Sequence, residues 1–202
     1  QLKLTESWTT YSLFFHELES KKSEVIFEDA KVIVKTIPLK HRVYTNGFLF
    51  QEKPGERKLN IEAVQHYNIH VAYYQKIKNG GDVKLDDGTI IENGKLSFDP
   101  IPSMSYAFCS DTVYNEDIIP IIENVDVLYH ESTFLESEAP LALKTLHSTA
   151  KEAAQIALKA NVKQLVLGHY STRYDGIERF KQEAESVFPN VLLGDDGLSF
   201  EF

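Results

Sequence analysis

Four short strings in the second half of the chain carry side chains suited to metal and phosphate chemistry. Asp111 lies in CSDT, Glu131 in HEST and His147 at the start of HST, while His169 and Arg173 share LGHYSTRY. Asp and His are the ligand types of a hydrolytic zinc centre, and Glu, His and Arg can transfer protons or contact phosphate. These residue types therefore indicate metal-assisted hydrolysis at a phosphate group.

Glu131 and His147 have the types of an acid–base pair. A carboxylate that holds one imidazole nitrogen selects the tautomer, so that the other nitrogen can give a proton to a leaving oxygen. His147 also precedes an expected helix N-terminus, marked by the capping-box spacing of Thr149 and Glu152, where backbone N–H groups favour phosphate. The structural alternative, two polar residues that flank a surface loop, stays open.

Asp111 and two histidines are weaker candidates when each is taken alone. Asp111 stands between Ser110 and Thr112, so its carboxylate could bridge two metals or cap the following turn. His169, and His41 in IPLKHRV, could be metal ligands or histidines satisfied at the rim of a sheet. They are therefore candidate metal ligands only if the fold brings their side chains to one place.

The remaining polar residues have more ordinary explanations. Arg173 could clamp a phosphate or pair on the surface with Asp175 or Glu178. Cys109 lies within an apolar strand and is expected to be inert packing. The other histidines have no partner at ligand spacing: His16, His66, His70 and His130.

Composition and charge bound the class of protein. The 202 residues include one cysteine, which excludes an internal disulfide and suits a reducing, cytoplasmic compartment. No apolar run is long enough to cross a membrane and no export leader is visible, so we expect no membrane partner. A net charge of −9 argues against broad coating of nucleic acid.

One segment departs from this acidic balance. Residues 51–84 carry six basic and four acidic side chains, a local charge of +2 that leaves −11 for the rest. If this basic segment forms an arm, the arm could contact RNA at one place, or it could simply be a solvated surface. Its basic residues include Lys76, Lys78 and Lys84.

Hydrophobic patterns divide the chain into three parts. In residues 1–50 we expect strands near 11–18, 24–29, 31–39 and 47–50. Residues 51–99 suggest a helix over 56–66 and then hairpins and loops around Gly80-Gly81, Asp86-Asp87-Gly88 and Asn93-Gly94.

Residues 100–202 predict a strand–helix–strand pattern. We expect strands at 106–110, 125–130, 163–168, 191–193 and 198–202, and helices at 117–123, 149–160 and 175–188. His41, Asp111, Glu131 and His169 each stand where a strand stops. In layered α/β folds, strand ends deliver side chains to a shared rim, so this α/β chain should gather them at one site.

CSDT, HEST, HST and LGHYSTRY, in this order and with this spacing, resemble the C-terminal motifs of ribonuclease Z, the tRNA 3′-processing endonuclease of the metallo-β-lactamase superfamily. IPLKHRVYTNGFLF is similar to the family segment that carries a further metal-binding histidine. The resemblance covers nearly the whole chain. It implies half of an αββα sandwich with a projecting exosite arm over residues 51–99.

The resemblance also implies residue roles. His41, Asp111 and His169 would bind zinc, with Asp111 between the two metals. Glu131 and His147 would assist proton transfer and Arg173 would hold RNA phosphate. The implied partners are precursor tRNA and a second copy of the protein in a homodimer.

The dense His-x-His-x-Asp-His cluster that completes such a site does not occur in this sequence, which begins with Gln1. We therefore expect the N-terminal part of the fold to be missing, and this chain alone to bind zinc poorly and to be inactive. Two other functions remain open: a metallo-β-lactamase-fold phosphodiesterase for small substrates, and a non-catalytic module for tRNA binding or dimerisation.

Overall fold

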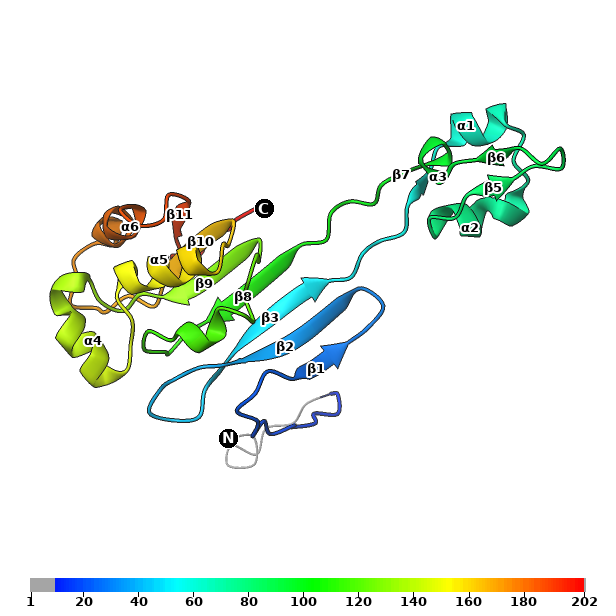
Figure 1. The fold of residues 1–202 in the computed structure, drawn as a ribbon. Helices are drawn as coiled ribbons and strands as arrows, with labels where there is room; N and C mark the ends of the chain where they lie inside the picture. The colour runs from blue at the N-terminus through cyan, green and yellow to red at the C-terminus, as the bar shows by residue number, and fades with distance from the viewer. Residues whose placement is uncertain (1–9, 202) are drawn as a thin grey trace.

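The computed structural model describes residues 10–201 and contains one large sheet (Figure 1). Its seven strands follow the order β1-β2-β3-β8-β9-β10-β11. β1 to β3 and β8 pair antiparallel, whereas β8 to β11 are parallel. The strands are β1 (Val25–Glu28), β2 (Val32–Pro38), β3 (Asn46–Glu52), β8 (Ser105–Cys109), β9 (Val127–Glu131), β10 (Gln164–Gly168) and β11 (Val191–Leu193).

Two helices cover one face of this sheet. α5 (Ala150–Lys159) and α6 (Glu178–Glu185) bury alanines, Ile156 and Phe180 in the same core as Ala107, Leu128 and Leu165 of the strands. α5 begins as the sequence predicts, because Thr149 and Glu152 form a reciprocal capping box. A third helix, α4 (Ala139–Thr145), and the short helices η2 (Glu116–Ile118) and η3 (Glu136–Glu138) lie in the connections.

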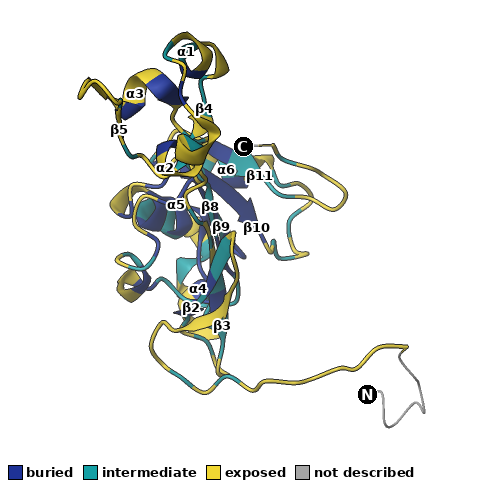
Figure 2. Cartoon of the chain, turned by 90° about the vertical axis from the view of Figure 1, so that its right-hand side faces the viewer, coloured by how far each residue is buried: buried dark blue, intermediate teal, exposed yellow. Residues whose placement is uncertain are grey.

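A separate small unit projects from the sheet on two extended connections (Figure 1). It has its own apolar core, made by Val64, Ile69, Ile77, Val83, Ile91 and Leu96. Most of its residues are exposed to solvent (Figure 2). Its elements are β4 (Lys58–Leu59), α1 (Ile61–His66), η1 (Val71–Tyr73), α2 (Tyr74–Lys78), β5 (Val83–Lys84), β6 (Ile90–Ile91), α3 (Asn93–Leu96) and β7 (Ser97–Phe98).

The small unit contains more helix than the turn-forming dipeptides suggest. The β5–β6 hairpin surrounds Asp86-Asp87-Gly88 as expected, but Asn93-Gly94 lies within α3. The helix expected from residue 56 begins only at Ile61, because Lys58 and Leu59 pair with β7 and the Asn60 side chain accepts a hydrogen bond from the Ala63 N–H.

Two expected strands and two further helix bounds are wrong. Residues 11–18 form no strand, and neither do residues 198–201, where Gly197 has a φ of +82° and turns the backbone; Phe202 and residues 1–9 lie outside the described part. The expected helix at 117–123 is the short η2, and the last helix is confined to Glu178–Glu185. No helix among the described residues is long and apolar enough to span a bilayer.

Gly168 ends β10 where the sheet has no room for a side chain. A Cβ at this position would lie 2.2 Å from the Tyr129 hydroxyl oxygen, whereas one at Gly94 would meet nothing within 4 Å. Gly168→Ala should therefore lower the free energy of unfolding by about 1–3 kcal/mol. Gly94→Ala, the matched control in α3, should be neutral or slightly stabilising. Urea unfolding of both variants checks this, and equal stabilities would contradict the close approach.

Candidate active site

The ends of four strands bring the candidate residues together. Glu131 ends β9, His169 directly follows β10, and Asp111 lies two residues beyond β8. His41 lies in the loop between β2 and β3. His147 joins them from the connection between α4 and α5, with its ring centroid 5.0 Å from that of His41 and 5.3 Å from that of His169.

Glu131 is the buried anchor of this cluster. Its side chain has no exposed surface and accepts five hydrogen bonds. Oε1 accepts from the Thr112 N–H at 2.8 Å and from His147 Nδ1 at 2.8 Å. Oε2 accepts from the Ser148 N–H at 3.1 Å and from the backbone and hydroxyl of Thr133 at 3.2 and 2.6 Å. Three of these partners are backbone N–H groups, which can only donate, so the carboxylate oxygens must accept from them.

Each of the three histidines at the site has one nitrogen held by the protein. Glu131 holds Nδ1 of His147, and the Leu146 carbonyl oxygen accepts from Nδ1 of His41 at 2.9 Å. Nδ1 of His169 lies 2.8 Å from the Thr133 hydroxyl. These contacts leave Nε2 of each ring available for a metal or a substrate.

Thr133 sets the tautomer of His169. Its single hydroxyl proton goes to Glu131, so the hydroxyl oxygen can only accept from His169 Nδ1. In the neutral ring, Nε2 of His169 then carries the lone pair, and this nitrogen lies 3.4 Å from Oδ1 of Asp111. Thr133 thus links the buried carboxylate to a candidate metal ligand.

Three residues of the site have left-handed backbone. Asp111, Leu146 and His169 have φ of 59°, 61° and 61°. Residues other than glycine rarely adopt this backbone conformation, so the surrounding structure must hold these three residues in it. At Leu146 the same turn ends α4 and directs the carbonyl oxygen to His41. The strained turns therefore serve to aim side chains and a carbonyl into the site.

The donor atoms fit a divalent metal such as zinc. Ligand atoms of His41, Asp111 and His147 lie within 4.8 Å of one another, and so do those of Glu131, His147 and His169. The oxygens of Glu131 are already occupied by hydrogen bonds. The atoms left to bind a metal are therefore imidazole nitrogens and the Asp111 carboxylate oxygens. Nitrogen and carboxylate oxygen are the ligands that zinc binds, and hydrogen bonds behind the histidines are typical of metal sites.

Arg173 lies at the rim of this cluster. Its guanidinium sits 5.1 Å from the centre of the Phe134 ring, which in turn is 6.4 Å from the His147 ring. It pairs with Glu138 at 3.6 Å rather than with Asp175 or Glu178, the partners considered from sequence. Half of the side chain stays exposed, so it can reach an anion at the site.

The other polar residues considered from sequence lie apart. His130 is fully buried on the opposite face of β9, with Nδ1 2.7 Å from the Glu131 carbonyl oxygen, and burial lowers its pKa. Burial raises the pKa of the Cys109 thiol to about 12, so the thiol is unreactive. Lys76, Lys78 and Lys84 all lie in the small projecting unit (Figure 1).

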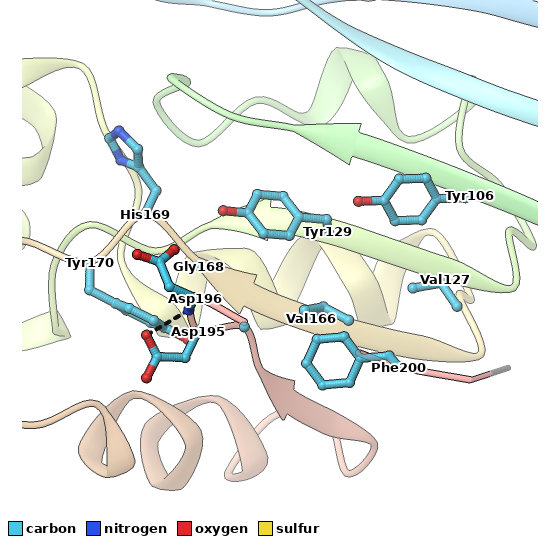
Figure 3. A pocket seen from close by; sticks show the side chains of 11 residues that line it. Tyr106, Val127, Tyr129, Val166, Gly168, His169, Tyr170, Asp195, Asp196 and Phe200 are labelled. Atoms are coloured by element: carbon cyan, nitrogen blue, oxygen red, sulfur yellow. Dashed lines mark hydrogen bonds between the residues drawn. The ribbon is translucent and has the colours of Figure 1, made fainter. Parts of the chain in front are cut away.

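A cavity of 650 Å³ extends from His169 along the sheet face that α5 does not cover. Tyr129, Tyr106 and Phe200 point into it, and Asp195 and Asp196 also line it, with Asp195 next to Tyr170 (Figure 3). Burial raises the pKa of Tyr106 to about 12, and burial and then the charges of Glu131 and Asp111 raise that of Tyr129. Both phenols therefore remain neutral and offer aromatic surface.

Sequence reasoning missed the residues that support the cluster. Thr133, Thr112, Ser148 and Leu146 contribute hydroxyl, N–H or carbonyl groups. Thr133 stands two residues after Glu131, the spacing that places its side chain on the same side of an extended chain. That spacing could have identified Thr133 from the sequence. The backbone contacts of Thr112 and Leu146 join distant segments, and a backbone group has no sequence pattern that predicts its partner.

Comparison with known proteins first defines the fold class. No protein-family model matches the chain. The metallo-β-lactamase fold protein YhfI from Bacillus subtilis superposes with a TM-score of 0.56 at 15% identity, over 90% of this chain and 53% of YhfI. Human tRNase Z, short form, gives a TM-score of 0.51 at 20% identity, over 88% of this chain and 46% of that protein. The chain has a metallo-β-lactamase fold.

Sequence similarity then identifies the relatives. Ribonuclease Z of Parabacteroides distasonis is 43% identical over 188 residues, which are 93% of this chain and 62% of that protein. The chain is a relative of ribonuclease Z and corresponds to the C-terminal part of those proteins. It spans about 62% of their length.

Thr133 provides a test of the hydrogen-bonded cluster. Thr133→Val keeps the shape but leaves Glu131 without its shortest donor, so the free energy of unfolding should fall by about 1–3 kcal/mol. Thr133→Ser keeps the hydroxyl and should retain most of the stability. Urea unfolding of the two variants measures the difference. A valine variant as stable as the serine variant would contradict the role of the hydroxyl.

Proposed function

We propose that this chain supplies the C-terminal two-thirds of a zinc-dependent endoribonuclease of the ribonuclease Z type, which removes 3′ trailers from precursor tRNA. One observation carries the proposal: His147 is held through Nδ1 by a buried carboxylate, and its ring stands between those of His41 and His169. Similarity to ribonuclease Z at 43% identity supports the substrate.

His41, Asp111 and His169 would hold the metal. His41 and His169 are oriented by hydrogen bonds at Nδ1, and the Asp111 carboxylate lies beside His169. When bound, zinc would stabilise negative charge on the phosphate as a Lewis acid. The protein's own part is to present Nε2 lone pairs and one carboxylate at fixed positions.

His147 would act as the proton donor at the leaving oxygen. Glu131 holds its Nδ1 proton, which orients the ring and stabilises the protonated imidazole. Arg173, at the rim, would pair with a phosphate of the RNA. Its exchange of Glu138 for phosphate is favourable because the pair with Glu138 is long and partly exposed.

The projecting unit, residues 51–99, would be the exosite arm that grips tRNA at a distance from the cut. Its separate core keeps it folded at the end of two extended connections. Lys76, Lys78 and Lys84 would contact tRNA phosphates. We also propose that the working enzyme is a homodimer, as the resemblance to ribonuclease Z implies.

Activity is best measured in a chimera, because the chain spans only 62% of its relative. The chain would replace the corresponding C-terminal part of the Parabacteroides distasonis protein. We expect the chimera to release the trailer from a precursor tRNA. Cleavage of a chromogenic phosphodiester without tRNA cleavage would instead favour a small-substrate phosphodiesterase. Metal-loaded, folded chimera that binds tRNA but cleaves neither substrate would favour a non-catalytic module.

His147→Ala tests the proposed proton donor. In the chimera it should lower turnover of precursor tRNA by about 10²–10⁴-fold, because general acid catalysis is lost. Zinc content, measured by elemental analysis, should stay unchanged. His16→Ala, at an exposed position outside both the cluster and the projecting unit, is the matched histidine control and should keep full turnover. Unchanged turnover in His147→Ala, or loss of zinc with it, would refute the assignment.

Neutralising the arm should weaken tRNA binding through phosphate contacts. Each lost contact should reduce the slope of log affinity against log salt by about one unit. Lys76→Ala and Lys84→Ala should have larger effects than Lys78→Ala, because Lys78 already pairs with Glu56 at 3.5 Å. Filter binding of mature tRNA by this chain over a salt series measures the slopes. Slopes equal to that of the unaltered chain would contradict the proposal that these lysines contact tRNA phosphates.

A further inference from the structure

A groove of 890 Å³ opens beside the candidate active site. One wall is the loop between β2 and β3, a second is formed by residues 21–23, and side chains of residues 113–121 complete the lining. His41 and Leu146 line its inner end, so the groove begins at the cluster described above. Beyond these two residues, its lining includes none of the other candidate site residues, Asp111, Glu131, His147 and His169.

The groove is basic although the chain as a whole carries −9. Lys21, Lys22, Lys40 and Arg42 line it, against the single acidic residue Asp117, a balance of +3. Asp117 pairs with Lys40 at 2.5 Å. Within residues 10–201 the other three cations form no salt bridge.

Hydrogen bonds hold the two walls together. The Tyr44 hydroxyl donates to the Ser20 carbonyl oxygen at 2.8 Å, and the Ser23 hydroxyl donates to the Thr36 carbonyl oxygen at 2.7 Å. The Lys40 N–H donates to the Thr112 hydroxyl at 3.2 Å, which ties the loop to the segment that carries Asp111. Residues 21 and 22 thereby line the same groove as Arg42.

Aromatic and apolar surface accompanies the charge. Tyr44 is 48% exposed and Val43 60% exposed, and both line the groove. Cations along a groove together with an exposed aromatic ring are the combination that binds single-stranded nucleic acid, where phosphates meet the cations and a base stacks on the ring. In a duplex the bases are stacked on one another inside the helix, so none is free to stack on the tyrosine ring.

We propose that this groove binds the single strand of RNA that continues from the phosphate at the active site. Phosphates lie against Lys21, Lys22 and Arg42, and a base stacks on Tyr44. The identity of the strand rests on the proposed function, but binding of single-stranded RNA by the groove does not require cleavage.

Fluorescence anisotropy of labelled decauridine with this chain, over a salt series, tests the groove directly. Lys21→Ala/Lys22→Ala/Arg42→Ala should weaken binding at least tenfold and reduce the salt slope by about 2 units, at about 0.7 per contact. Tyr44→Ala should weaken binding about fivefold or more, the lower end of base stacking on an aromatic ring. Circular dichroism confirms that the variants are folded.

The matched control removes the same charge from the projecting unit, in Lys76→Ala/Lys84→Ala/Lys95→Ala. It should leave decauridine affinity within about twofold, although it weakens binding of whole tRNA. Equal losses in the groove and control variants would show a general charge effect and overturn the proposal. Absence of binding at low salt, a preference for duplex RNA, or displacement by millimolar inorganic phosphate would also overturn it.

The assay separates this proposal from the proposed function. Groove-dependent binding of decauridine by a protein whose chimera leaves precursor tRNA uncut would refute the nuclease and keep the groove. Cleavage by a chimera whose groove variants bind decauridine normally would refute the groove and keep the nuclease.

Discussion

The burial of the Glu131 carboxylate is the constraint on which the site depends. A charge without solvent contact is tolerated only when donors surround it, and five donors do so here. They come from the segment after β8, the segment after β9 and the connection that precedes α5. Satisfying one carboxylate therefore fixes three separate pieces of chain relative to one another. His147 and, through Thr133, His169 take their orientation from the same group.

The sheet supplies the frame for this arrangement. β8, β9 and β10 are parallel and adjacent, so their carboxyl ends lie at one edge. Left-handed turns at Asp111 and His169 then point the side chains that follow these strands toward each other. The projecting unit is built differently, because its core shares no residue with the core of the sheet. The cluster around Glu131 and the projecting unit are therefore packed independently of one another.

Much of the chain could be predicted from sequence for physical reasons that can be named. The apolar runs in β8, β9 and β10, the capping box of α5 and the strand-end positions of Asp111, Glu131 and His169 are local signals. The sequence motifs resembling ribonuclease Z agree with relatives at 43% identity. The roles of the site residues and the limits of the arm remain predictions.

What sequence could not provide is the set of long-range contacts. The Leu146 carbonyl oxygen that binds His41 is separated from it by 105 positions, and a backbone acceptor has no signature. The apolar residues at 11–18 suggested a strand, but a strand needs a partner edge, which pattern alone does not supply. In the projecting unit, short helices form because six apolar side chains pack together, against the turn preference of Asn93-Gly94.

The most direct measurement is the free energy of unfolding of Glu131→Gln compared with that of Glu123→Gln, an exposed glutamate. If the buried carboxylate organises the site, Glu131→Gln should lose about 3–5 kcal/mol, because an amide group cannot accept from all five donors. Glu123→Gln should stay within about 0.5 kcal/mol of the unaltered chain. A loss at Glu131 no larger than at Glu123 would contradict the account.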